Sequence, residues 1–248
     1  MFDEKLNKIH CQGCLEGMKE LPDNYADVVI TSPPYNAGKS VRGNFYSEYS
    51  DDLPMQEYFN FIKDVINECL RVTKHYVFFN FQILRNNKIA YLQIFEHFKE
   101  NIKEILIWHK KQVQPSIQET CLSSAFEFIL VFSSKKSAEN RSFERAFFNN
   151  KVRGQLNTNV IYGNNAAKEK NNTDNKAIFP QYFVEFFVKK FTQEGDIVLD
   201  PFIGSGTTGI VAKKFRRHFI GFEINKDYAD EGMKRINFVK EQKSLGEW

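Results

Sequence analysis

The sequence lacks any long apolar run. No stretch of its 248 residues approaches the roughly 20 apolar residues that a membrane-spanning helix needs. The amino-terminal residues, Met1 to Lys5, also lack the basic and then apolar pattern of a signal peptide. We therefore expect a cytoplasmic protein that does not associate with a membrane.

Cysteine is scarce. Four cysteines are too few for a disulfide-dense scaffold. Cys11 and Cys14 have the C-x-x-C spacing of some redox and zinc sites, but no second cysteine pair or histidine cluster completes four ligands. The sequence therefore predicts no metal site.

Apolar and charged residues are present in the proportions of a globular protein, at 42% and 26%. No internal repeat is found, and seven apolar runs are typical of β-strands. Helix-like stretches lie between them, including 55–72, 179–192 and 226–240. This alternation predicts an α/β fold with a doubly wound, mostly parallel sheet covered on both faces. The predicted strands are 8–11, 27–31, 76–81, 105–109, 126–132, 197–200 and 219–223.

Two short motifs follow predicted strands. Thr31-Ser32-Pro33-Pro34-Tyr35-Asn36 comes after the run 27–30, and Asp200-Pro201-Phe202-Ile203-Gly204-Ser205-Gly206-Thr207-Thr208-Gly209 comes after 197–199. Each is therefore predicted to be a loop at the carboxyl end of a strand, where α/β sheets bind ligands.

The two motifs, in this order, resemble those of the permuted (beta-class) amino-group DNA methyltransferases. These enzymes transfer a methyl group from S-adenosylmethionine to the exocyclic nitrogen of cytosine or adenine. The resemblance covers most of the chain. It implies a Rossmann-like, seven-stranded methyltransferase sheet that is circularly permuted, so that the third strand of the usual order comes first and the second comes last.

The first motif has residues suited to activating an amine. An exocyclic amine is a poor nucleophile because its lone pair is delocalised into the ring. The Ser32 hydroxyl and the Pro33 carbonyl can accept its two hydrogens, and the consecutive prolines Pro33 and Pro34 stiffen the backbone. Tyr35 is suited to stack on a base extruded from the duplex. A rigid turn or a polyproline ligand is the alternative interpretation of this tetrapeptide.

The residue before Pro-Pro-Tyr bears on the choice of base. In the family, serine at this position is typical of cytosine-N4 enzymes, and Asp or Asn of adenine-N6 enzymes. Ser32 therefore favours cytosine, although Asn36 is frequent in adenine enzymes and a hydroxyl can serve either base. Methylation at cytosine C5 is disfavoured, because that family uses a cysteine that follows proline, and no cysteine here does.

The second motif predicts a small-molecule site. Gly204 and Gly206 permit a tight turn near a ligand, and Thr207 and Thr208 are candidates for capping the next helix. The pattern also satisfies the dinucleotide motif G-x-G-x-x-G, so a nicotinamide or flavin is an alternative ligand. A P-loop is excluded, because no lysine follows the glycines in the required place. Glu223, at the end of the next strand, is placed to accept hydrogen bonds from ribose hydroxyls of either cofactor.

The resemblance favours S-adenosylmethionine over a nicotinamide. It places Asp200 near the methionine moiety, with loop bracing as the alternative role. It also implies that segment 177–180 holds the methionine end. Besides the glycines, the threonines and Glu223, the residues that the resemblance assigns to cofactor binding are Ala177, Phe179, Pro180, Asp200, Pro201 and Phe202.

One position departs from the family pattern. Related sequences place Gly-Asp before Cys-Leu-Glu at the end of the first strand, whereas this chain has Gln12-Gly13-Cys14-Leu15-Glu16. The carboxylate that the resemblance implies near the cofactor adenine is thus absent from Gly13. Weak cofactor affinity or a substitute group is expected.

Positive charge is concentrated in residues 133–176. This segment has nine basic and four acidic residues, a balance of +5, whereas the whole chain carries +3. It is also rich in asparagine and poor in aliphatic residues, which predicts an insertion or long loop between parts of a core. A phosphate backbone attracts such a segment, and a solvated loop without a partner is the alternative. In the permuted methyltransferases the target-recognition region lies here, and we assign DNA contacts to Lys151 and Arg153, and to Lys39 and Arg42 after the catalytic motif.

The predicted organisation is one domain in three parts. Residues 1–132 form the catalytic half, 133–176 the basic insertion for target recognition, and 177–248 the cofactor-binding half. The resemblance implies double-stranded DNA as substrate and a restriction-modification system with a cognate endonuclease. Monomer and homodimer stay open. A nicotinamide-dependent oxidoreductase and a non-catalytic DNA-binding protein are the alternatives from other classes, and RNA or protein glutamine are alternative substrates.

Overall fold

An eight-stranded sheet forms the centre of the protein. The computed structural model describes residues 3–38, 51–111, 113, 120, 122–134, 142–147, 157–163 and 179–240. Within these residues the strand order is β1-β8-β7-β2-β3-β5-β4-β6, and all neighbours are parallel except β3–β5 and β5–β4. The strands are β1 (Lys8–Cys11), β2 (Ala26–Thr31), β3 (Thr73–Phe81), β4 (Ile102–Lys110), β5 (Phe126–Phe132), β6 (Val160–Gly163), β7 (Ile197–Asp200) and β8 (His218–Glu223).

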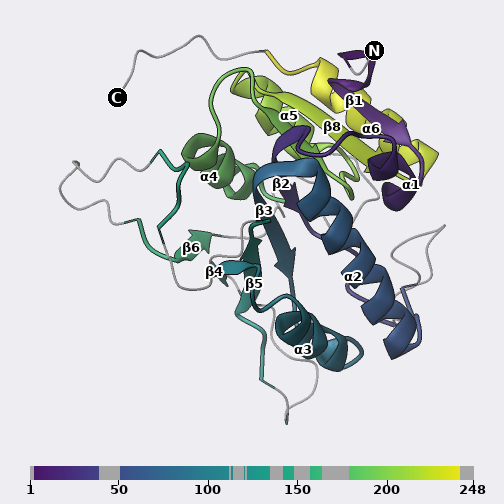
Figure 1. Ribbon diagram of the computed structural model, residues 1–248, viewed down its shortest axis with the longest axis vertical. Coiled ribbons are helices and arrows are strands. Elements are labelled where there is room, and N and C mark those ends of the chain that lie inside the picture. Colours follow the sequence, from purple (N-terminus) through teal and green to yellow (C-terminus); the bar gives the residue numbers. More distant parts are fainter. Residues whose placement is uncertain are drawn as a thin grey trace.

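Helices cover both faces of this sheet. The helices are α1 (Cys14–Lys19), α2 (Met55–Val72), α3 (Lys88–His97), α4 (Gln181–Phe191), α5 (Thr207–Lys214) and α6 (Lys226–Asn237), and a short 3-10 turn, η1 (Asp3–Lys5), precedes β1. Helices α1 to α3 share one apolar core with the sheet, and α4 to α6 share a second core on the other face. Figure 1 shows α2 and α3 on one side of the strands and α4 on the other. The predicted doubly wound, mostly parallel α/β fold is confirmed.

The apolar periodicity of α2 explains its position. The helix has the predicted bounds, and Pro54 precedes its first residue. Most of its buried residues are three or four positions apart, so they form one stripe that faces the sheet, while the polar side of the helix faces solvent. The buried stripe consists of Tyr58, Ile62, Val65, Ile66, Cys69 and Val72.

The sheet has one strand more than predicted. All seven predicted strands are present, and β6 lies within the segment that we predicted to be a loop or insertion. Strand β6 pairs with β4, where Ile107 is opposite Val160. It is an edge strand of only four residues, with Ile161 buried and Tyr162 60% exposed, and is too short for a periodic pattern to be recognised in the sequence.

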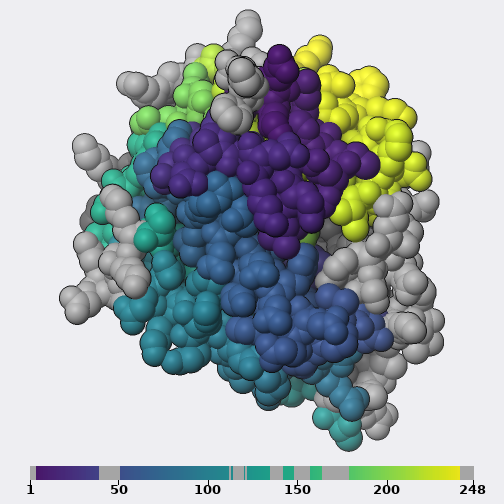
Figure 2. All heavy atoms as spheres, turned by 45° about the vertical axis from the view of Figure 1, so that its right-hand side comes forward, coloured from purple at the N-terminus to yellow at the C-terminus, as the bar shows by residue number. Residues whose placement is uncertain are grey.

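The ends of the described chain lie side by side. Strand β1 pairs with β8, and the Ile9 amide donates to Met233 Sδ of α6 at 3.3 Å. Figure 2 shows the amino-terminal residues between α2 and α6 on one face of the molecule. No helix in the described part of the chain combines the length and apolar character that a membrane span requires.

Strands β2 and β7 are adjacent at the centre of the sheet. They are parallel, with Val28 opposite Val198 and Val29 opposite Leu199. Their carboxyl ends, Thr31 and Asp200, therefore reach the same edge of the sheet. This register brings the two sequence motifs together.

Candidate active site

A buried hydrogen bond joins the two motif loops. Thr31 Oγ1 donates to Asp200 Oδ1 at 2.7 Å, and Thr208 Oγ1 donates to Asp200 Oδ2 at 2.6 Å. The Phe202 amide also donates to Asp200 Oδ1, at 3.1 Å. Burial raises the pKa of Asp200 to about 6, although these three donors act in the opposite direction. Asp200 thus braces the end of β7 against β2 and α5.

The glycine-rich loop follows Asp200. Gly204 and Gly206 have φ values of 51° and 85°, which glycine adopts without strain. A Cβ atom at Gly206 would lie 3.0 Å from the backbone of Gly232, so the loop also approaches α6 closely. The predicted capping of α5 by Thr207 and Thr208 is wrong. Gly206 is the N-cap residue, and no side chain makes a capping hydrogen bond.

This loop offers polar groups to a ligand. Thr207 Oγ1 is buried at the first residue of α5 and has no hydrogen-bond partner among the described residues. Glu223, at the tip of β8, accepts from the Asn225 amide at 2.8 Å, and burial raises its pKa. Phe202 is half-buried, with its ring centroid 6.1 Å from that of Phe61. These groups fit a nucleoside cofactor. They combine an unpartnered hydroxyl, a carboxylate and an aromatic ring with glycines that let a ligand approach the backbone.

Hydrogen bonds from two helices hold the Ser-Pro-Pro-Tyr loop. Pro33 and Pro34 are buried, and Ser32 and Tyr35 are half-buried. Tyr58 Oη of α2 donates to the Pro34 carbonyl at 2.8 Å, and Asn87 Nδ2, just before α3, donates to the Tyr35 carbonyl at 2.7 Å. The Pro34 carbonyl is thus engaged within the protein. The loop is a braced structure and not an exposed polyproline segment.

A polar cluster surrounds the Tyr35 hydroxyl. Tyr35 Oη lies 2.8 Å from Ser32 Oγ, 2.9 Å from Glu127 Oε2 and 2.8 Å from Asn80 Nδ2. Lys110 forms an ion pair with Glu127. The sequence motifs do not single out Asn80 or Glu127. A signal for both exists, because each is a polar residue inside an apolar strand, where burial requires a partner.

The comparisons with known proteins agree with this geometry. The profile of the family described as DNA methylase, the N6/N4 methylases, matches residues 26–234, which include both motif loops. The chain belongs to the N6/N4 DNA methylase family. The match spans most of residues 1–132, all of 133–176 and most of 177–248, the three predicted parts of the chain.

Individual relatives of this DNA methylase are similar over most of their length. The type II methyltransferase M.HpaI of Haemophilus parainfluenzae is 26% identical over 93% of this chain and 74% of its own. M.BglII of Bacillus subtilis is 28% identical over 92% of this chain and 68% of its own. Among solved structures, PvuII DNA methyltransferase (cytosine-N4-specific) has a TM-score of 0.72 at 20% identity, over 95% of this chain and 87% of that one. That structural likeness confirms the fold.

The departure at Gly13 has a structural counterpart in this DNA methylase. A Cβ atom at Gly13 would lie 2.2 Å from Glu16 Oε2, so the Glu16 carboxylate occupies the space of a side chain at position 13. Burial raises the pKa of Cys14 to about 12, and the charges of Glu16 and Glu223 act in the same direction. Glu16 in the first turn of α1 and Glu223 at the end of β8 therefore both lie near Cys14.

Asn36 is a buried residue whose side chain supports the loop. It is 1% exposed, its Oδ1 accepts from the Leu53 amide at 2.6 Å, and its Nδ2 donates to the Leu53 carbonyl at 2.9 Å. Its own amide donates to Asp51 Oδ1 at 2.7 Å. Asn36 therefore connects the Ser-Pro-Pro-Tyr loop to the chain before α2.

Three further predicted cofactor residues, Phe179, Pro180 and Pro201, lie in the described structure. Phe179 and Pro180 lie at the start of α4, where the Phe179 ring centroid is 4.8 Å from that of Phe183. Pro201 is buried beside Asp200. Five predicted contact residues fall outside the described residues, so their placement stays a prediction: Lys39, Arg42, Lys151, Arg153 and Ala177.

One basic residue of segment 133–176 is used inside the protein. Arg145 Nη2 donates to Asp196 Oδ2 at 2.6 Å, and Arg145 Nη1 lies 3.7 Å from Asp27 Oδ1. Asp27 and Asp196 lie at the amino-terminal ends of β2 and β7, opposite the motif loops. Arg145 therefore anchors this part of the segment to the sheet and is not available as a free DNA contact.

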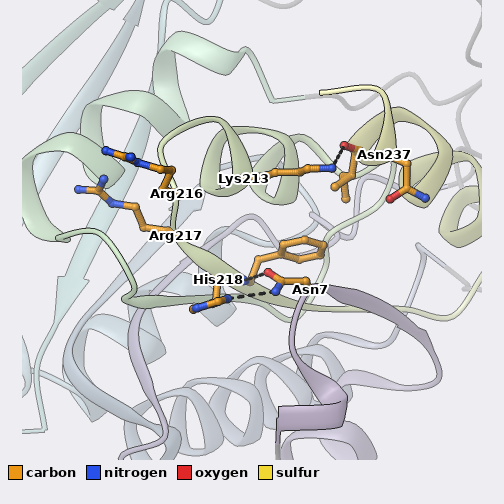
Figure 3. Close-up of a pocket in the computed structure, with 8 residues that line it drawn as sticks. Asn7, Lys213, Arg216, Arg217, His218 and Asn237 are labelled. Atoms are coloured by element: carbon orange, nitrogen blue, oxygen red, sulfur yellow. Dashed lines mark hydrogen bonds between the residues drawn. The ribbon is translucent and has the colours of Figure 1, made fainter. Parts of the chain in front are cut away.

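A cavity of about 340 Å³ lies away from the motif loops. It is lined at the amino-terminal end of β8 by His218, with Lys213, Arg216 and Arg217 (Figure 3). Lys213 Nζ donates to the Ile236 carbonyl at 3.1 Å, and Arg217 donates to the Thr192 hydroxyl at 2.9 Å. These cations bind neighbouring groups of the protein. The cavity lies at the opposite end of β8 from Glu223 and is therefore separate from the candidate active site.

Proposed function

We propose that this DNA methylase transfers a methyl group from S-adenosylmethionine to the exocyclic N4 of a cytosine that is flipped out of double-stranded DNA. The observation that carries the proposal is the 2.7 Å hydrogen bond between Thr31 and Asp200, which places the Ser32 loop beside the glycine-rich loop. A base bound at the first loop and a methyl donor bound at the second would then be neighbours. Positioning of this kind supplies much of the acceleration in a transfer between two bound molecules.

The Ser32 loop activates the amine. Ser32 Oγ and the Pro33 carbonyl accept its two N–H groups, which draws the nitrogen lone pair out of conjugation with the ring. Pro34 keeps the Pro33 carbonyl in a stiff, extended backbone. Tyr35 presents its ring, held in place through its hydroxyl, for stacking on the flipped base.

The glycine-rich loop and the neighbouring strand ends hold the cofactor. S-adenosylmethionine supplies a methyl group on a positively charged sulfur. Glu223 accepts hydrogen bonds from the ribose hydroxyls. Gly204 and Gly206 let the cofactor approach the backbone closely, and Thr207 offers a buried hydroxyl that has no partner among the described residues. Phe202 contacts the adenosine, and Asp200 and Thr208 fix the loop near the methionine end.

Glu16 replaces the carboxylate that Gly13 lacks. Its Oε2 lies 2.2 Å from where a Cβ atom of residue 13 would be, so the acidic group occupies the same space from the next turn of α1. We assign it the contact with the adenine amine of the cofactor. A side chain at position 13 would take up this space, so the Glu16 carboxylate would have to shift.

Ser32 carries the choice of cytosine over adenine. Asn36, which favoured adenine as the alternative, is buried and bonded to Leu53, so it supports the loop and does not face a base. The two acceptors of the Ser32 loop can also serve the amine of adenine, so adenine N6 is the alternative target.

Three further assignments belong to this proposal. Segment 133–176, part of which forms β6, recognises the DNA sequence. The order of the two motifs and of the strands supports a circularly permuted chain, with a catalytic half before this segment and a cofactor-binding half after it. The type II relatives support a restriction-modification system with a partner endonuclease.

The test is transfer of labelled methyl groups. The protein is incubated with mixed-sequence duplex DNA and S-adenosylmethionine labelled in its methyl group, and the DNA is then digested to nucleosides and separated. Label in N4-methylcytosine, lost in Ser32→Ala, is the expected result. Label in N6-methyladenine would keep the mechanism and reverse the base, and label in neither nucleoside would overturn the proposal.

A further inference from the structure

The hydroxyl of Tyr35 lies at the centre of five side chains that we call the Glu127 cluster. Asn80 Nδ2 is 2.6 Å from Glu127 Oε2 as well as 2.8 Å from Tyr35 Oη. Glu127 is 6% exposed and Asn80 is 1% exposed, so water does not dilute these interactions. The cluster consists of Ser32, Tyr35, Asn80, Lys110 and Glu127.

Glu127 forms a largely buried ion pair with Lys110. Lys110 Nζ also lies 5.3 Å from the centre of the Trp108 ring. In an ion pair with a lysine, the oxygens of the carboxylate carry no hydrogen and act only as acceptors.

This charge fixes the direction of the next two hydrogen bonds. Because Glu127 Oε2 only accepts, Tyr35 Oη must donate its single hydrogen to Glu127. Tyr35 Oη then has only lone pairs for its other neighbours. In the 2.8 Å contact between Ser32 Oγ and Tyr35 Oη, Ser32 must therefore be the donor.

We propose that Glu127, acting through Tyr35, orients the Ser32 hydroxyl so that its oxygen faces the target amine only as an acceptor. This inference rests on the proposed function of Ser32. A serine hydroxyl that is free to rotate can point its hydrogen at the amine nitrogen and bind the lone pair needed for attack. The cluster prevents that rotamer. Glu127, Asn80 and Lys110 are thus positioning residues, and none of them needs to contact the base.

Two conservative variants separate this role from simple support of the fold. Tyr35→Phe keeps the stacking ring and removes the hydroxyl that receives the Ser32 hydrogen. Glu127→Gln keeps the size of the side chain. The glutamine oxygen is drawn to Lys110, so its NH₂ group faces Tyr35 and reverses the direction of the hydrogen bonds.

We expect each variant to lower kcat by about 10- to 100-fold, the effect of one hydrogen bond to a charged group. KM for DNA and Kd for S-adenosylmethionine should stay within twofold of wild type. The double variant should have the kcat of Tyr35→Phe alone, because Glu127 acts through that hydroxyl. Glu96→Gln, an exposed residue paired with Lys99, is the matched control and should keep wild-type kinetics.

Two kinetic results would overturn the proposal. One is a double variant whose loss of kcat equals the product of the two single losses, and the other is an unchanged kcat in folded Glu127→Gln.

A second measurement does not depend on methyl transfer. Neutron diffraction from deuterium-exchanged wild-type crystals should locate the Tyr35 deuterium toward Glu127 and the Ser32 deuterium toward Tyr35. A Tyr35 deuterium that points to Ser32 would refute the inference even in an active enzyme. The expected orientation in a protein that methylates no DNA would show that only the proposed function fails.

Discussion

Thr31 and Asp200 are 169 positions apart in the chain and are joined by a hydrogen bond of 2.7 Å between buried side chains. Thr31 ends β2, and Asp200 ends the adjacent parallel strand β7. The bond therefore fixes the distance between the loop that carries Ser32 and the loop that carries the glycines. Loss of this link should affect stability, cofactor binding and methyl transfer together.

Thr31→Val removes the hydroxyl while keeping the shape of the side chain. Asp200 then loses one of its three donors, so we expect the free energy of unfolding to fall by about 1–2 kcal/mol at pH 7. Urea denaturation of the protein without cofactor measures this change. Thr207→Val is the matched control, because the Thr207 hydroxyl is buried without a partner among the described residues and its loss should cost nothing. Equal destabilisation by the two variants would contradict the bracing role.

Asp200→Asn should change the pH dependence of stability. Folding raises the pKa of Asp200 from 3.8 to about 6, so the folded state binds this proton more tightly than the unfolded state. The resulting stabilisation is complete below pH 3.8 and is lost as the pH rises through 6. Relative to Asp200→Asn, the wild type should lose about 2 kcal/mol of unfolding free energy between pH 4 and pH 7. Parallel curves for the two proteins would exclude a raised pKa.

Two carboxylates should contribute to cofactor affinity. Glu223→Gln and Glu16→Gln each replace an acceptor by a group that also donates, so we expect each to weaken S-adenosylmethionine binding by about 10-fold. Isothermal titration calorimetry without DNA gives the Kd values, and Glu96→Gln serves as the control. If Glu16→Gln binds as tightly as wild type, Glu16 is not the substitute for the carboxylate missing at Gly13.

Gly206→Ala should destabilise the glycine-rich loop by more than backbone strain alone. Gly206 and Gly195 have nearly equal φ values of 85° and 84°, but a Cβ at Gly206 lies 3.0 Å from the Gly232 backbone whereas a Cβ at Gly195 meets nothing within 4 Å. Gly195→Ala therefore measures strain alone, about 1–2 kcal/mol. Gly206→Ala should cost more and should also weaken S-adenosylmethionine binding. Equal losses of stability would show that the loop can move away from α6.

Much of the fold was predictable because its signals are local. The apolar stripe of α2 predicted Met55–Val72 with the observed bounds, and seven apolar runs predicted seven of the eight strands. Strand β6 was missed, because an edge strand of only four residues is too short to show a periodic pattern in the sequence. Arg145 was counted among the basic residues of segment 133–176 from composition alone, and its ion pair with Asp196 depends on folding.

The sequence by itself determined the fold class, the two strand-end motifs and the chemistry that we propose for Ser32 and the glycines, because these depend on periodicity and residue type within short windows. Only the tertiary structure decided which distant side chains meet. It brought Glu127, Asn80 and Lys110 to Tyr35, and it turned Asp200 toward Thr31. Such contacts depend on the register and order of strands, which the packing of the whole sheet sets and no local pattern encodes.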